Sequence, residues 1–300
     1  MSNQQTANRV KRRPQARRGR TVVAARDSAT RPRRTAWFVA AIVVAVGGAL
    51  VFVFASGSHH SGRAIPIVGR EQAPAALVSK VISVPTDVIT RVGEGAVTGL
   101  PAKLPGPILA TADGKPRIIY LGAEYCPYCA TERWAMVQAL SRFGTFSNLQ
   151  ITTSAGAPEP YPHTPTFSFH GASYTSTNIQ FEPIEEQDNS RHPLDSPTSE
   201  QASLIAKYDA PPYVNGTSGG TIPFIDFANT YLISGVTYNP AVLKGRTHAQ
   251  IAAALWDPST DISQGVIGAA NAIAATICKL TNNRPARVCT PVKSIVRQLG

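Results

Sequence analysis

The feature that most constrains this chain of 300 residues is an uncharged apolar run of twenty residues, from Ala36 to Ala55. At about 1.5 Å per residue, a helix of that length spans the hydrocarbon core of a bilayer. Trp37 lies near one end of the run, where aromatic side chains commonly anchor a helix at the membrane interface. The run therefore predicts a single transmembrane helix over residues 36–55.

Almost all of the net positive charge lies before this run. Residues 1–35 contain eleven Lys and Arg residues and a single acid, Asp27, so they carry +10 of the net charge of +11. The positive-inside rule then predicts a cytoplasmic N-terminus, with everything after about Gly57 outside. We expect residues 1–35 to be a basic disordered tail. It has no aromatic residue on which bases could stack, so anionic lipid headgroups suit it better than nucleic acid does.

The segment that follows predicts a linker and then one large domain. A cleaved signal peptide ending at Ala55 is the alternative to an anchor, but the leader and the apolar run are both long for such a signal. Residues 56–70 contain Ser, Gly and the pair His59-His60, which we interpret as a solvated linker. The expected extracytoplasmic domain covers residues 71–300 and is nearly neutral, which does not favour nucleic-acid binding.

A cysteine pair stands where a predicted strand meets a predicted helix. Residues 117–123 are a short apolar run rich in strand formers, and they lead directly into Cys126-Pro127-Tyr128-Cys129. A helix is expected over residues 130–143, with its apolar residues on one face and Gly144 as the stop. The first cysteine thus falls at a helix N-terminus, where unpaired N–H groups and the helix dipole lower the pKa of a thiol.

This placement indicates redox chemistry. We expect Cys126 to be the exposed nucleophile that attacks a disulfide, and Cys129 to resolve the mixed disulfide that forms. Pro127 suits an early helical position because no amide hydrogen is needed there. Two alternatives stay open: a structural zinc site that also recruits Cys278 and Cys289, and an inert disulfide within the motif. We expect no metal and no cofactor.

The other two cysteines indicate a structural disulfide. Cys278 and Cys289 flank a loop after a predicted amphipathic helix, and in an oxidising compartment such a pair most often forms a stabilising crosslink. A second redox relay and two free thiols are the alternatives.

The rest of the chain alternates between short strands and helices. Residues 155–197 are rich in Pro, Ser and Thr and predict hairpin or edge strands. The remaining predicted elements are a broken helix over 72–93, strands over 149–153, 221–227 and 231–235, and helices over 199–208 (with Ser199 as N-cap), 248–256 and 262–280.

The order strand, Cys126-Pro127-Tyr128-Cys129, helix and, far downstream, Ile222-Pro223 at the start of a strand resembles the thioredoxin superfamily. The motif itself matches the one typical of glutaredoxins. The resemblance implies an α/β thioredoxin-like fold with insertions, preceded by one N-terminal transmembrane helix. It also implies that Pro223 is a cis-proline opposite the redox pair, and that Pro127, Tyr128 and Ile222 contact the substrate. A trans proline starting an edge strand is the alternative.

More narrowly, residues 70–298 resemble a membrane-anchored, thioredoxin-like family catalogued as domain of unknown function 929. The chain departs from the superfamily pattern in two places. Tyr125 stands where thioredoxins have a tryptophan, and Tyr120 stands where they have a buried acid, with Glu124 as a weak substitute. The segment 155–197 exceeds the minimal fold, and we expect it to shape a substrate groove.

Together these features predict a thiol–disulfide oxidoreductase anchored in the cell membrane by one helix. Its substrates would be protein thiols and disulfides outside the cytoplasm. The direction of electron flow and a redox partner in the membrane are left open. The alternative is a non-catalytic extracytoplasmic binding module on a thioredoxin-like scaffold.

Overall fold

The computed structural model describes residues 69–300 except 112 and 215–218. The predicted tail (1–35), transmembrane helix (36–55) and nearly all of the linker (56–70) lie outside these residues. Among the helices that are described, none combines the length and the apolar character needed to cross a membrane. The described part is a mixed α/β domain.

Its main sheet is built around β3 (Arg117–Gly122), all six residues of which are buried. Apolar side chains on both faces are typical of a strand that is covered on both sides. The strand order is β2-β10-β9-β3-β8, with β3 and β8 parallel and the other pairs antiparallel. The other four strands are β2 (Ala102–Lys103), β8 (Gln180–Glu185), β9 (Phe224–Phe227) and β10 (Tyr231–Ser234).

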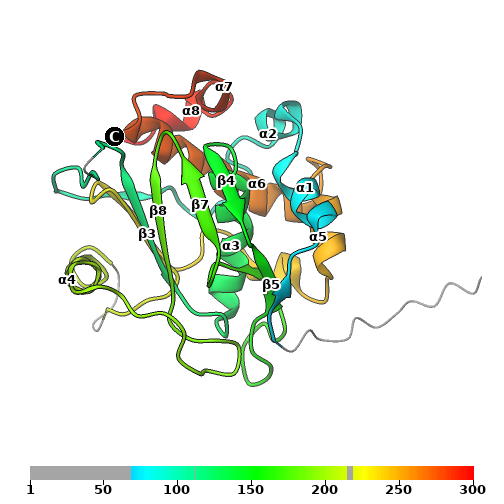
Figure 1. Cartoon of the computed structure of the whole chain (residues 1–300). Coiled ribbons are helices and arrows are strands. Elements are labelled where there is room, and N and C mark those ends of the chain that lie inside the picture. The colour runs from blue at the N-terminus through cyan, green and yellow to red at the C-terminus, as the bar shows by residue number, and fades with distance from the viewer. Residues whose placement is uncertain (1–68, 112, 215–218) are drawn as a thin grey trace, which may run out of the picture. The chain divides into compact units, whose positions relative to one another are not determined.

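Helices cover both faces of this sheet. Figure 1 shows α4 (Ser199–Tyr208) on one side of β3 and β8, and α3 (Pro127–Leu140) and α6 (Asp261–Leu280) on the other. Side chains of β3 alternate between the two resulting cores, because successive residues of a strand point to opposite faces. Ile118 and Tyr120 enter the larger core, whereas Ile119 and Leu121 enter the smaller core beneath α4.

The remaining elements pack around the larger core. Two further sheets are described, of three strands and of two: β1 (Glu71–Gln72), β5 (Gln150–Thr153) and β6 (Pro165–Ser168), and β4 (Gly144–Ser147) with β7 (Ser173–Ser176). The other helices are α1 (Ala75–Ile82), α2 (Thr86–Val92), the 3-10 helix η1 (Pro240–Leu243), α5 (His248–Ala254), α7 (Ala286–Cys289) and α8 (Lys293–Val296).

The helix after the cysteine motif differs from its prediction in two ways. It covers residues 127–140 rather than 130–143, because the Cys126 side chain caps its N-terminus and the predicted stop, Gly144, begins β4 instead. It is also buried on nearly every side rather than on one face, since every residue except Tyr128 is buried. Its contacts with α6, α1 and β6 explain this, so α3 is a central helix.

Smaller corrections concern strand and helix starts. The N-cap of α4 is Thr198, not Ser199, and it forms a capping box with Gln201. The strand predicted from residue 221 starts at Phe224. The segment 155–197 is only partly an insertion, because it contributes β8, the edge strand that pairs in parallel with β3. Parallel pairing could not be predicted from the alternating pattern alone, since hairpins show the same alternation.

The structure joins Cys278, near the end of α6, to Cys289 of α7 by a disulfide. Both residues are buried. This bond removes the two thiolates that a four-cysteine zinc site would have required.

Candidate functional site

The candidate site is centred on the junction between β3 and α3. Cys126 is the N-cap residue of α3, and its Sγ accepts a hydrogen bond from the Cys129 backbone N–H at 3.3 Å. Pro127 occupies an early helical position, as the sequence predicts. A sulfur that accepts a hydrogen bond from the first helical turn also faces the positive end of the helix dipole, and both effects favour a thiolate.

Both thiols of the motif are free, but neither is open to solvent in the way we expected. Cys126 is 5% exposed and Cys129 is fully buried at 0%. The prediction of an exposed Cys126 is therefore wrong, because the Ile222-Pro223 segment packs against its sulfur. The two cysteines differ in exposure only slightly, since Cys126 alone keeps some contact with solvent.

The electrostatic environment separates the two thiols further. Hydrogen bonds from the Cys129 thiol and the Cys129 and Tyr128 backbone N–H groups, together with the nearby charge of Arg133, lower the pKa of Cys126 to about 7 despite its burial. Burial and the neighbouring Cys126 sulfur raise the pKa of Cys129 well above its usual value. Cys126 is thus the sulfur that is ionised near neutral pH, which fits a nucleophile, and Cys129 stays protonated.

The downstream proline lies directly beside this sulfur. The Ile222–Pro223 peptide bond is cis, and the Ile222 carbonyl oxygen lies 3.9 Å from Cys126 Sγ although the two residues are 96 positions apart. Pro223 is buried, whereas Ile222 is partly exposed. The fold therefore brings together the two parts of the sequence-predicted site.

Two tyrosines close to Cys126 in the sequence, Tyr125 and Tyr128, keep exposed surface. Tyr128 is 37% exposed, and its ring meets that of Tyr161 edge-to-face with centroids 6.1 Å apart. Tyr125 lies under the guanidinium of Arg191 at 3.7 Å, and Arg191 in turn pairs with Glu159. Pro127 is buried in the helix start, so of the motif's middle two residues only Tyr128 presents a surface.

Sequence reasoning missed a buried ion pair behind the cysteines. Arg133 and Glu185 are both 0% exposed. The Arg133 guanidinium donates two hydrogen bonds of 2.7 Å to the Glu185 carboxylate, from Nε to Oε1 and from Nη2 to Oε2. Arg133 stands four residues after Cys129 and therefore on the same helical face. Its charge acts to lower the pKa of both Cys126 and Cys129. A charged residue one turn after the motif is the signal that could have revealed it.

The position of the expected buried acid holds Tyr120, as the sequence indicates. Its ring reaches over Gly122, where a Cβ atom would overlap the phenol oxygen, and burial raises its pKa well above the usual value. Within the described residues, the Tyr120 hydroxyl and Arg133 Nη1 are buried without a hydrogen-bond partner. Glu124, the substitute considered for the acid, is instead held by Arg70 and Ser168.

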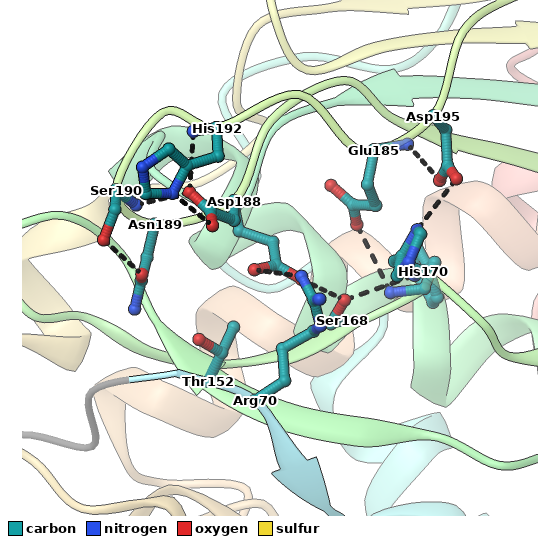
Figure 2. A network of polar contacts seen from close by, with 12 residues as sticks. Arg70, Thr152, Ser168, His170, Glu185, Asp188, Asn189, Ser190, His192 and Asp195 are labelled. Atoms are coloured by element: carbon teal, nitrogen blue, oxygen red, sulfur yellow. Dashed lines mark hydrogen bonds and ion pairs between the residues drawn. The ribbon is translucent and has the colours of Figure 1, made fainter.

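Hydrogen bonds from neighbouring residues hold both the backbone and the carboxylate of Glu185. Figure 2 shows the Asp195 carboxylate between His170 and the Glu185 backbone; it lies 2.8 Å from His170 Nδ1 and accepts from Glu185 N–H at 3.1 Å. The Phe169 N–H adds a hydrogen bond to Glu185 Oε1 at 3.4 Å. Moving the Glu185 carboxylate away from Arg133 would break both Arg133 hydrogen bonds and the one from Phe169, while Asp195 holds the Glu185 backbone in place.

Across residues 69–300, apart from the five that are not described, no group of three or more His, Cys, Asp or Glu side chains is arranged to hold a metal ion.

Fold and site together define a mixed α/β protein that presents two free thiols, three residues apart, at the start of a central helix. Residues 106–279, more than half of the chain, match the sequence profile of a family described as a domain of unknown function (DUF929), and the chain belongs to this family. The matched range is narrower than the 70–298 covered by the resemblance. No curated protein and no solved structure gives a significant match.

Proposed function

We propose that this protein is a thiol–disulfide oxidoreductase with a thioredoxin-like domain, and that Cys126 and Cys129 are its redox pair. One observation carries the proposal. The Cys126 sulfur caps α3, accepts the Cys129 N–H at 3.3 Å and has a pKa lowered to about 7. A low-pKa thiol next to a second, protonated thiol is the arrangement that disulfide exchange requires.

The architecture supports the thioredoxin-like assignment. The strand β3 leads into the motif and α3, its parallel neighbour β8 follows, and the cis Ile222–Pro223 bond precedes β9 and faces the first sulfur. We assign Cys126, Cys129 and Pro223 to the reaction centre. Ile222 and Tyr128 are assigned to substrate contact, with Pro127 shaping the helix start between them.

The exchange proceeds in two steps that balance. The Cys126 thiolate attacks one sulfur of a substrate disulfide, the substrate S–S bond breaks, and the departing thiolate takes up a proton. Cys129 then loses its proton and attacks Cys126 Sγ, which releases the second substrate thiol and leaves a Cys126–Cys129 disulfide. Two electrons pass from protein to substrate, and an oxidised protein runs the same steps in reverse.

We also propose that the domain acts outside the cytoplasm on protein thiols and disulfides. The charge asymmetry around residues 36–55 motivates a single-pass anchor in the cell membrane with a cytoplasmic N-terminus. The Cys278–Cys289 disulfide supports this location, because structural disulfides persist mainly in oxidising compartments.

Disulfide exchange by the purified protein tests the proposal. The reduced protein should reduce a small disulfide, and Cys126→Ser should abolish this. Cys129→Ser should instead stop turnover after one step and accumulate a mixed disulfide detectable by mass spectrometry. If Cys126→Ser keeps full activity, the assigned nucleophile is wrong.

The burial of Cys126, at 5% exposure, is the observation that favours the alternative of a non-catalytic binding module. Alkylation of the reduced protein separates the two functions. An oxidoreductase should label at Cys126 quickly, with a rate that rises through pH 7, whereas a binding module should label slowly at every pH.

A further inference from the structure

A cavity of about 460 Å³ lies beneath α4, on the face of the main sheet opposite α3. Its walls are mainly apolar and come from the end of β3, from α4 and from the segment before Pro223. Its apolar lining residues include Leu121, Pro197, Ile205, Ala206 and Ile222. A pocket of this size and character is large enough to take a long side chain.

The cavity adjoins the redox sulfur through a shared residue. Ile222 lines the cavity, while its carbonyl oxygen lies 3.9 Å from Cys126 Sγ. Leu121 lines it as well and stands at the end of the strand that leads into the motif. Only Ile222 therefore separates a group bound in the cavity from the Cys126 sulfur.

Two acidic residues, Asp209 and Glu186, line the cavity. Asp209, the C-cap residue of α4, is 2% exposed, and neither of its carboxylate oxygens has a hydrogen-bond partner of good geometry in the described part of the chain. Burial raises its pKa to about 6, and the neighbouring Thr221 and Gly220 N–H groups and the Ser234 hydroxyl limit the rise. Glu186 is partly exposed and also lines the cavity. No basic side chain is found among the described residues of the lining.

We propose that this cavity binds the cationic side chain, lysine or arginine, of a polypeptide whose disulfide reacts at Cys126. The apolar walls suit the aliphatic stem of such a side chain, and the Asp209 and Glu186 carboxylates suit its charged end. Burial makes the Asp209 carboxylate costly to ionise, and a cation supplied by the substrate lowers that cost. The assignment rests on the proposed function and adds to it the class of substrate.

The test compares three symmetric disulfides of similar length: bis(aminohexyl), bis(hydroxyhexyl) and bis(carboxypentyl) disulfide. Full-length reduced protein is reacted with each, and the rate constant of the first step is measured at pH 7.5. The cationic disulfide should react about fivefold faster than the neutral one, and the anionic disulfide should be the slowest. High salt should reduce the differences.

Variants locate the effect. Asp209→Asn, Glu186→Gln and the exposed Ala206→Lys should each cut the cationic preference to about twofold or less. Glu200→Gln is the matched control, because it removes one acid from the same helix. Glu200 pairs with Arg117 and lines a different cavity, so the preference should survive.

Hexylamine and hexanol provide a second readout that needs no redox step. Ligand-observed saturation-transfer NMR with the full-length protein should show hexylamine binding that Asp209→Asn weakens. Equal rates for the three disulfides overturn the cavity assignment, as does a loss in Glu200→Gln equal to that in Glu186→Gln. If no disulfide reacts, the proposed function fails, and the cavity assignment then stands or falls on whether hexylamine binds better than hexanol.

Discussion

The two cysteine pairs of this protein occupy opposite kinds of helix end. Cys126 and Cys129 are free and stand at the N-terminus of α3, whereas Cys278 lies near the C-terminus of α6 and is bonded to Cys289, eleven residues on. The positive end of a helix stabilises a thiolate and the negative end disfavours one. The comparison indicates that helix polarity favours a thiolate at Cys126 and not at Cys278.

The two helices also differ in what they bury. The buried residues of α6 are all uncharged, but those of α3 include Glu132 and Arg133. The buried residues of α6, which carry no charge, give the disulfide an inert setting. Buried charges behind a cysteine pair tune its ionisation instead, so α3 combines the roles of core helix and electrostatic scaffold.

Removing one sulfur from each pair should produce the largest contrast. Cys126→Ser is expected to lower the rate of disulfide exchange by at least about a thousandfold, because the attacking atom is lost. The double variant Cys278→Ser with Cys289→Ser should keep its exchange rate within about twofold. Stopped-flow exchange with a small disulfide measures both. A similar loss of exchange rate in the two proteins would show that the two cysteine pairs do not differ in function.

Breaking the buried ion pair should be the next largest effect. Arg133→Met leaves the Glu185 carboxylate buried without its partner and should lower the free energy of unfolding by about 3–5 kcal/mol. Replacing both residues, Arg133→Met with Glu185→Leu, should recover most of this loss. In both proteins the pKa of Cys126 should rise above about 7, because Arg133 favours the thiolate. Urea unfolding and pH-dependent alkylation provide the two measurements, and an unchanged alkylation midpoint in the double variant would contradict the role given to Arg133.

Opening the structural disulfide should cost somewhat less stability. The Cys278→Ser, Cys289→Ser protein is expected to lose about 3 kcal/mol, since the crosslink restricts the unfolded chain. The matched control is Cys126→Ser with Cys129→Ser, which should change the free energy of unfolding far less because these thiols are not crosslinked. Equal losses in the two proteins would show that the pairs do not differ as proposed.

The last effect concerns how the stability of the protein depends on pH through Glu132 of α3. Glu132 is buried and accepts hydrogen bonds from Thr237, and burial raises its pKa to about 7. The folded state therefore keeps on Glu132 a proton that the unfolded state releases at the ordinary glutamate pKa of about 4.5. The stability from this group is fully present below about pH 4.5 and is lost as the pH rises through about 7, a change of up to about 3 kcal/mol.

Glu132→Gln should flatten part of this slope. Unfolding free energies at pH 5 and pH 8 should differ less in the variant than in the original protein. Asp226, whose pKa burial raises to about 7, should supply a slope that remains. Identical slopes in the two proteins would show that Glu132 ionises normally.

Local patterns predicted a good part of this molecule. The strand predicted over residues 117–123, the helix after the motif and Pro127 at its first turn follow from short-range preferences. The structure has all three, with the strand ending at Gly122. The errors also have local causes. Sequence periodicity assigned one apolar face to α3, but α1, α6 and β6 surround the helix and bury its polar residues as well.

The sequence by itself determined the two cysteines of the motif and their place at a helix N-terminus, because that arrangement depends only on neighbouring residues. Only the tertiary structure decided which groups surround the sulfur. It brought Ile222 to Cys126, Glu185 to Arg133, and Asp209 and Glu186 to one cavity. These partners lie far apart along the chain, and their contacts depend on how β3, β8, α3 and α4 pack. Local preferences carry no information about such packing.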